Sequence, residues 1–280
     1  MTAASAATTT PALPARKPVL VTVGMSIDVR DPNDGRLLRT LQRTPEGAFD
    51  TDVQISADGA STYVLREYGD FGACGRNQVV SVATGGGEVR PLVEEPTRIA
   101  DFAVAPDRRT VAYERTDCSA GPSELVLLDL ATGRKRVLDR PDTGDGLAFA
   151  TDSRRLVAAG QIIDTTATDP FAGAVRLARP QAFDPRFRPS DGQLVVSVRE
   201  VDEGPISVVA VDDRTGRDVG AVRPITSDAG SLVSDPSGMR YVGLRFPKEA
   251  DDEMLGQLVA IRNSKALALG KVDAFAVAWG

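Results

Sequence analysis

Six aspartates recur along the chain at intervals of 49, 44, 39, 44 and 45 residues, and they are the residues whose type and spacing most clearly suggest chemistry. Converging carboxylates repel one another unless a cation or a basic group lies between them. Ca²⁺ takes about six to eight oxygen ligands and needs no imidazole, so the pattern indicates a calcium site if the side chains meet. The alternative is that each carboxylate accepts backbone N–H groups at a turn, and no cofactor is then needed. The six are Asp52, Asp101, Asp145, Asp184, Asp228 and Asp273, with Arg98 as a basic group that could relieve part of the repulsion.

The chain contains no histidine, which removes whole classes of mechanism. Ser-His-Asp and Cys-His triads, imidazole metal ligands and the usual proton carrier near neutral pH are all excluded. The sequence therefore predicts no catalytic residue. A calcium-dependent hydrolase or lactonase stays open as an alternative, although asparagine, a common calcium ligand in such enzymes, occurs only at Asn33, Asn77 and Asn263.

Composition and net charge limit the classes of molecule that the protein could bind. The 280 residues are 42% apolar and 26% charged, which is typical of a globular chain. The net charge of −6 and the lack of a basic run argue against a nucleic-acid partner. No stretch approaches the roughly 18 consecutive apolar residues of a membrane span. Residues 1–16, rich in small residues, threonine and proline, are expected to form a disordered leader or a stalk, and they lack the pattern of a signal peptide.

A repeat of about 40–50 residues organises the rest of the chain. Each repeat has an alternating run, a turn rich in Pro, Asp, Ser and Gly, and a second run of β-branched and aliphatic residues. Three repeats continue into a hairpin with a glycine turn, at Thr84-Gly85, Thr132-Gly133 and Thr215-Gly216. Residues 161–180 are the poorest match and predict short or displaced outer strands. The repeats start at Val53, Phe102, Leu147, Pro185 and Ser231, and a partial one starts at Phe275.

The two ends of the chain complement each other. Residues 275–280 resemble an inner strand without its three partners, and residues 19–24, 26–31 and 36–41 resemble three partners without an inner strand. Pairing them would close a ring and remove its open sheet edges. The sequence therefore predicts an all-β, six-bladed β-propeller over residues 17–280, with the last blade made by both termini.

The turns carry a family resemblance. Ala105-Pro106-Asp107, residues 188–192 and residues 235–238, each followed by an apolar strand, resemble the SPDG repeat of the TolB-like six-bladed β-propeller family, which is related to WD40-like repeats. Residues 57–59 and 151–153 depart from the repeat because they lack the proline, and no part of this sequence is expected to form the α/β domain that precedes the propeller in TolB proteins. The resemblance implies the architecture, because this repeat is scaffold.

Long loops between the second and third strands predict the binding face, since recognition residues accumulate on loops of a rigid scaffold. Carboxylates there would steer a basic peptide or protein, and aromatic residues would anchor it. Alternatively, the charges form a solvated rim and the aromatic residues pack under their own loops. The predicted ligand-binding residues are Tyr68, Asp70, Phe71, Phe246, Asp251, Asp252 and Glu253.

Cys74 and Cys118 fall in the long loops of adjacent repeats, so a disulfide between them is sterically reasonable. A disulfide would suit an oxidising compartment outside the cytoplasm, whereas two unrelated thiols would suit the cytoplasm, and the sequence leaves localisation open. The function predicted from these observations is a monomeric, non-enzymatic propeller that binds a basic peptide or protein on an acidic long-loop face around its channel. The alternatives are the calcium-dependent enzyme and a structural component of envelope assembly.

Overall fold

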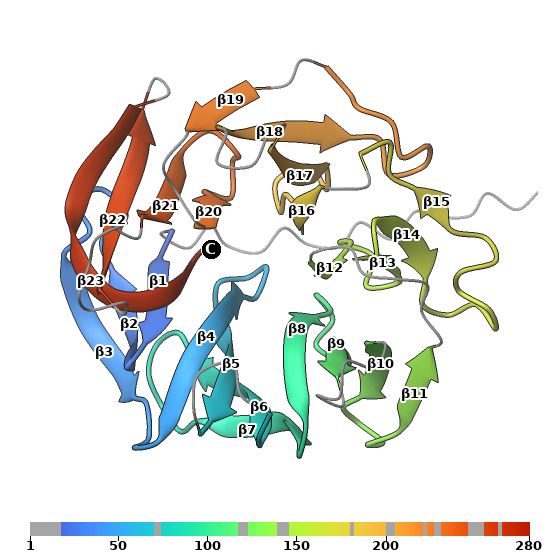
Figure 1. Ribbon diagram of the computed structural model, residues 1–280, viewed down its shortest axis with the longest axis horizontal. Helices are drawn as coiled ribbons and strands as arrows, with labels where there is room; N and C mark the ends of the chain where they lie inside the picture. The colour runs from blue at the N-terminus through green and yellow to red at the C-terminus, as the bar shows by residue number, and fades with distance from the viewer. Residues whose placement is uncertain are drawn as a thin grey trace, which may run out of the picture.

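The computed structural model describes residues 18–69, 74–116, 123–138, 146–179, 182–199, 205–220, 223–226, 231–245, 255–262 and 265–280. Over these residues every regular element is a β-strand, and the sheets are arranged around a central axis (Figure 1). The predicted all-β fold is confirmed. The leader expected at residues 1–16 lies outside the described residues.

Four repeats fold into separate four-stranded antiparallel sheets, in each of which chain order is also the order from one edge to the other. The strand that comes first in the chain faces the central axis (Figure 1). The first sheet holds β4 (Ala48–Ile55), β5 (Ser61–Tyr68), β6 (Asn77–Ala83) and β7 (Arg90–Glu95). The second holds β8 (Arg98–Val104), β9 (Thr110–Thr116), β10 (Glu124–Asp129) and β11 (Lys135–Leu138). The third holds β12 (Ala148–Phe149), β13 (Arg155–Ala158), β14 (Gln161–Asp164) and β15 (Val175–Arg176), and the fourth holds β16 (Phe183–Phe187), β17 (Leu194–Arg199), β18 (Ile206–Val211) and β19 (Arg223–Thr226).

A seven-stranded sheet completes the circle. In spatial order it contains β20 (Ser231–Ser234), β21 (Tyr241–Arg245), β22 (Leu255–Arg262), β23 (Lys265–Trp279), β1 (Leu20–Gly24), β2 (Ser26–Arg30) and β3 (Leu37–Arg43). Strand β23 pairs with β22 over its first part and with β1 over its last part. Divided at β23, the sheet contains two four-stranded units that share this strand. Counted in this way, the described residues form six four-stranded units.

The two ends of the chain close the ring. Leu20 pairs with Trp279, and the N–H of Val19 donates to the carbonyl of Gly280 over 2.7 Å. Closure by the terminal strands is therefore confirmed. The structure differs from the expectation in one respect, because β23 is continuous from Lys265 and does not begin at Phe275. No proline interrupts this stretch, and a register shift opposite Leu258 and Val259 absorbs the change in direction.

The hydrophobic core lies between adjacent sheets. One cluster, for example, joins Leu65 and Val79 of the first sheet to Phe102 and Tyr113 of the second. Alternation along each strand supplies these contacts, because successive side chains point to opposite faces. The two-residue β15 agrees with the short outer strand predicted for the third repeat. The inner strand β12 is equally short, which the sequence pattern did not predict.

Turn geometry follows the sequence closely, with one correction. Gly133 and Gly216 have φ values of 71° and 70°, the left-handed conformation predicted for these hairpins. At the first hairpin, Gly86 and Gly87 have positive φ, and Gly85 does not. Three successive glycines offer the turn several positions for a positive φ, so composition alone does not select one.

Candidate functional site

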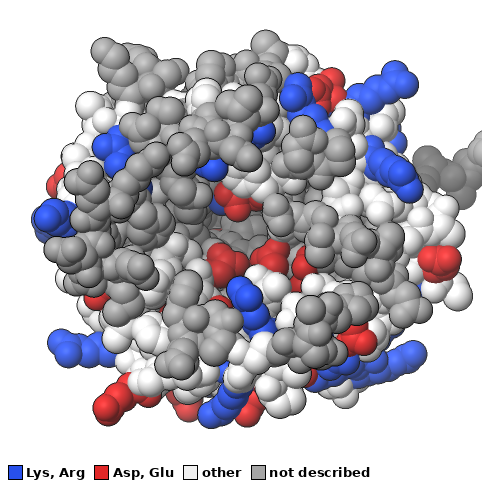
Figure 2. All heavy atoms as spheres, in the orientation of Figure 1, with Lys and Arg blue, Asp and Glu red and all other residues white. Residues whose placement is uncertain are grey.

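A cavity of about 240 Å³ lies at the centre of the ring. Inner strands or the residues beside them from all six units line it, and acidic side chains gather around the central hollow (Figure 2). Pockets that hold drug-sized molecules are about 300–1,000 Å³. The cavity therefore suits a single side chain or a small molecule.

Bulges in the inner strands set the direction of the acidic side chains. The register shifts between Asp50 and Asp52 on β4, and between Ile99 and Asp101 on β8. A third shift surrounds Asp184 on β16, whose φ of 47° is unusual for a residue with a side chain. A bulge re-aims side chains, and a strained backbone is common at functional positions. Asp52, Asp101 and Asp184 all line the cavity.

Backbone groups satisfy part of this charge, as the structural alternative for these aspartates requires. Asp52 Oδ1 accepts the N–H of Val53 over 2.7 Å, and Asp101 Oδ1 accepts that of Phe102 over 2.7 Å. Asp101 Oδ2 also accepts the N–H of Leu147 over 2.6 Å, which ties the second unit to the third. Asp52 and Asp101 thus stabilise the backbone through hydrogen bonds, and their carboxyl groups also line the cavity.

The carboxyl groups are costly to ionise. Burial raises the pKa of Asp52 to about 6; the Val53 hydrogen bond lowers the pKa, Asp184 raises it and Arg186 lowers it. Burial also holds the pKa of Asp101 well above its usual range, and the charges of Asp52 and Glu114 add to this effect. A cation entering the cavity would relieve the same repulsion.

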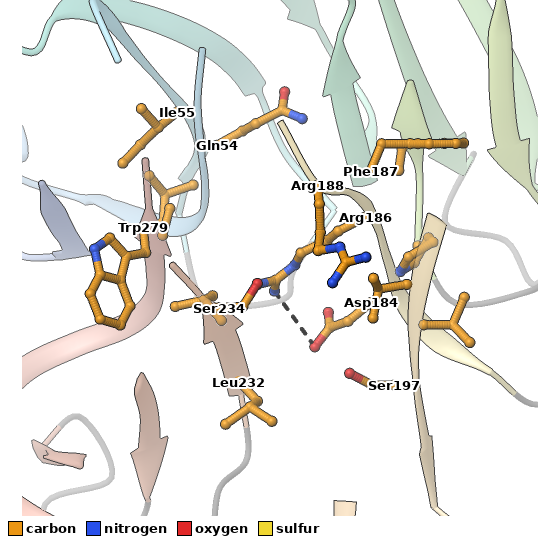
Figure 3. A pocket seen from close by; sticks show the side chains of 18 of the residues that line it. Gln54, Ile55, Asp184, Arg186, Phe187, Arg188, Ser197, Leu232, Ser234 and Trp279 are labelled. Atoms are coloured by element: carbon orange, nitrogen blue, oxygen red, sulfur yellow. Dashed lines mark ion pairs between the residues drawn. The ribbon is translucent and has the colours of Figure 1, made fainter. Parts of the chain in front are cut away.

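The basic group among these carboxylates is Arg186. Arg186 Nη2 lies 3.9 Å from Asp184 Oδ2, and Figure 3 shows both side chains at the centre of the site. Arg98, which the sequence suggested for this role, is exposed at the first position of β8 and does not line the cavity. Arg188 also lines the cavity, and it is held by Asp191, with 2.7 Å between Nη2 and Oδ2.

An aromatic wall completes the cavity. Trp279, the only tryptophan of the chain, lines it near the end of β23. The guanidinium of Arg240 lies 4.9 Å from the centre of the Trp279 ring and pairs with Asp235 over 3.0 Å. Sequence reasoning missed Arg186 and Trp279. Arg186 lies on β16 two residues after Asp184, and a register shift between Phe183 and Arg186 interrupts the alternation there, so the sequence pattern offered no signal for this arginine.

Three of the six aspartates predicted as calcium ligands, Asp52, Asp101 and Asp184, line the cavity. Asp273 is exposed on β23 and does not line the cavity, and Asp145 and Asp228 lie outside the described residues. Within the ranges that the structure describes, no three acidic or cysteine side chains form a group that could hold a metal ion. A metal site that includes Asp145 or Asp228 stays a prediction.

Most of the predicted ligand-binding residues lie outside the described residues. Tyr68 is described; its hydroxyl donates to Gln78 Oε1 over 3.0 Å, and the guanidinium of Arg76 lies 4.8 Å from its ring centre. Cys74 is disulfide-bonded. The chain has one other cysteine, Cys118, which lies outside the described residues. The remaining predicted ligand-binding residues, all outside the described ranges, are Asp70, Phe71, Phe246, Asp251, Asp252 and Glu253.

Sheets arranged around a central channel and a ring closed by both termini define a β-propeller. Among solved structures, TolB from Acinetobacter baumannii is similar, with a TM-score of 0.65 and 12% identity. The match covers 94% of this chain and 66% of that chain, so this chain spans slightly less than two thirds of that protein's length. A putative TolB from Agrobacterium tumefaciens has a TM-score of 0.61 and 16% identity, with 93% of this chain and 91% of that chain covered.

A putative 6-phosphogluconolactonase from Bacteroides uniformis is also similar, with a TM-score of 0.52 and 13% identity over 95% of this chain and 100% of that chain. At these identities the likeness concerns the fold, and the predicted resemblance to TolB-like propellers is confirmed at that level. No protein-family model and no curated protein matches the sequence. The described ranges contain no helix of the length and hydropathy that a membrane span requires.

Replacing Asp52 with asparagine should stabilise the protein at pH 7.5 by roughly 1–3 kcal/mol. The pKa of Asp52 rises from 3.8 to about 6 on folding, so the folded state binds more protons than the unfolded state between these values. The contribution of Asp52 to stability should therefore fall as pH rises from about 4 to about 6 and stay level above. An asparagine side chain cannot ionise, so the free energy of unfolding of the variant should lose this part of its dependence on pH. Urea denaturation from pH 4 to pH 8 measures the free energy of unfolding of both proteins.

Asp164 provides the control, because the guanidinium of Arg154 holds the pKa of its carboxyl below the usual range. Its contribution to stability is present above the unfolded pKa and is lost on acidification, so Asp164→Asn should not stabilise the protein at pH 7.5. Identical slopes for the wild type and Asp52→Asn between pH 4 and pH 6 would contradict the assignment.

Proposed function

We propose that this chain is a non-enzymatic binding propeller whose central cavity takes a positively charged side chain from a peptide or protein partner. The observation that carries the proposal is that Asp52, Asp101 and Asp184 all line one cavity, which has room for one side chain. The net charge of −6 would steer a basic partner towards the protein.

The charges that line the cavity favour a cation. Arg188 and Asp235 each have a close partner of opposite sign, Asp191 and Arg240. The other charged residues that line it are the three inner-strand aspartates and Arg186. A cationic ligand would lower the raised pKa values of Asp52 and Asp101, and by linkage these carboxylates would bind the cation more strongly once ionised. Binding should therefore strengthen as pH rises through about 6.

The predicted acidic loops extend this proposal outward. In it, Asp251, Asp252 and Glu253 attract the partner before one of its basic side chains enters the cavity. Attraction of this kind raises the association rate and is screened by salt. Charge reversal at these three positions should therefore slow association and weaken its dependence on salt.

Trp279 provides a built-in probe, because the chain has one tryptophan and it lines the cavity. Titration with acetyl-Gly-Arg-Gly-amide should change the tryptophan fluorescence. The glutamine analogue should bind at least about tenfold more weakly, since charge-assisted hydrogen bonds are worth about 1.5–3 kcal/mol. The double variant Asp52→Asn/Asp101→Asn should weaken binding of the arginine peptide by a similar factor.

Asp164→Asn is the matched control, because it removes one carboxylate from an exposed surface pair and should leave affinity unchanged. Equal affinity for the arginine and glutamine peptides would overturn the proposal, as would unchanged binding by the double variant. A Ca²⁺ titration belongs in the same series. Saturable binding of Ca²⁺ that the double variant loses, with no peptide binding, would favour the calcium-dependent alternative instead.

A further inference from the structure

Two arginines line the cavity, Arg186 and Arg188, and Arg186 donates fewer hydrogen bonds to the protein. Its closest contact to Asp184 is 3.9 Å, longer than the roughly 2.7–3.2 Å of a hydrogen bond. Among the described residues it makes this one ion pair and no hydrogen bond, and its side chain is 37% exposed. Arg188, two residues further on, donates to both carboxylate oxygens of Asp191, over 3.2 and 2.7 Å. The two arginines therefore differ in how much donor capacity they offer a ligand.

A guanidinium group with unused donors is matched to a carboxylate. Its planar fork presents five N–H groups and can bind both oxygens of a carboxylate at once. Figure 3 shows Arg186 directed to the centre of the cavity, near Ser234 of β20 and Asp184. A ligand carboxylate at this point would meet the guanidinium inside a partly enclosed space, where charge pairing is stronger than in water.

The cavity thus presents two charges of opposite sign to one small ligand. Asp52 and Asp101 come from β4 and β8, and Arg186 comes from β16. Both Asp184 and Arg186 act electrostatically on Asp52, so the two kinds of charge lie close together. About 240 Å³ leaves room for one residue and not for a folded segment.

We propose that the cavity binds a basic amino-acid residue whose carboxylate is free, with its cationic group at Asp52 and Asp101 and its carboxylate at Arg186. This deepens the proposed function and rests on it. The same chemistry is found at the C-terminus of a peptide that ends in arginine or lysine and in the free amino acid. A ligand carboxylate at Arg186 would balance the charge of the guanidinium, and the cationic end of the ligand would balance the carboxylates of Asp52 and Asp101.

Four probes test the proposal by tryptophan fluorescence or calorimetry. They are acetyl-Gly-Gly-Arg with a free carboxylate, the same peptide with an amide terminus, free arginine, and agmatine, which is arginine without its carboxylate. The peptide acid should bind the wild type at least about tenfold more tightly than the amide, since a bidentate charged contact is lost. Arg186→Gln should reduce this ratio to within about twofold, without weakening the binding of the amide.

Arg179→Gln is the matched control, because Arg179 pairs with Asp218 over 2.8 Å and does not line the cavity. It should retain the full ratio of the wild type. Arg186→Lys keeps the charge and loses the fork, so it should give an intermediate ratio. Circular dichroism and urea denaturation establish that each variant is folded before its ratio is read.

Equal binding of acid and amide by the wild type would overturn the carboxylate site and leave the proposed function standing, provided that the double aspartate variant binds neither. Failure of both peptides to bind would overturn the two proposals together. Free arginine and agmatine show whether the ligand carboxylate belongs to a free amino acid or to a peptide C-terminus. A tenfold preference for arginine over agmatine supports the proposal with the free amino acid as ligand, and a preference seen only between the peptides supports it with a peptide C-terminus.

Discussion

Replacing Arg66 with leucine is expected to lower the free energy of unfolding by about 3–5 kcal/mol. Arg66 Nε and Nη2 donate to the two carboxylate oxygens of Asp50 over 2.7 and 3.0 Å, and the two side chains are 3% and 0% exposed. Without Arg66, Asp50 would keep the hydroxyl of Thr44 as a donor and would hold a buried charge without a counter-ion. At roughly 2–4 °C per kcal/mol, the melting temperature should fall by about ten degrees.

The matched control is Arg154→Leu, which breaks an exposed pair with Asp164 whose side chains are 61% and 33% exposed. Its cost should stay below about 1 kcal/mol, as is typical of surface pairs. Adding Asp50→Leu to Arg66→Leu removes the stranded charge and should recover much of the loss. A cost for Arg66→Leu no greater than that of Arg154→Leu would show that the pair is not buried in solution.

The architecture was predictable because the same sequence pattern recurs in each repeat. Each repeat supplies the same turn, and the hydrogen bonds confirm it at positions as different as Gly59, Arg108 and Ser153, whose N–H groups close equivalent turns. Arg108 and Ser153 adopt the left-handed conformation without being glycine, with φ near 59°. The repeat therefore tolerates a locally unfavourable residue where the neighbouring strands enforce the turn.

The first halves of the inner strands were missed for a physical reason. Strand β4 begins at Ala48, and the sequence pattern predicted its start at Val53. A bulge between Asp50 and Asp52 puts one extra residue into the strand and breaks the alternation on which the prediction depended. The same effect hides the start of β8 at Arg98, because the register shifts before Asp101.

The site was predictable only where it repeats. Asp52, Asp101 and Asp184 recur with the blade period, and the structure brings them to one cavity. Arg186 and Trp279 each occur once, so no periodic signal distinguishes them from other residues of their strands. Their position at the cavity depends on the closure of the ring, which brings β16 and β23 to the same cavity although the two strands are far apart in the sequence.

Val277→Asp should be among the most destabilising single substitutions in the chain, with an expected cost of about 5 kcal/mol. Val277 is 3% exposed and packs with Leu20 and Val233 at the closure. It pairs with Thr22 in the register of β1 and β23 that joins the two ends. Aspartate there would lose the apolar contacts and place a carboxylate among buried apolar side chains.

Val277→Asp should also affect the ring as a whole, because the ring closes through the pairing of β1 with β23. Weakening it exposes the edges of both strands, and open edges pair with other chains. The variant should therefore show a lower melting temperature in thermal denaturation and a larger aggregated fraction in size-exclusion chromatography. Lys271→Asp introduces the same residue at an exposed position of β23 and should change the stability by less than about 1 kcal/mol. Equal melting temperatures for Val277→Asp and Lys271→Asp would show that the pairing of the terminal strands does not stabilise the closed ring.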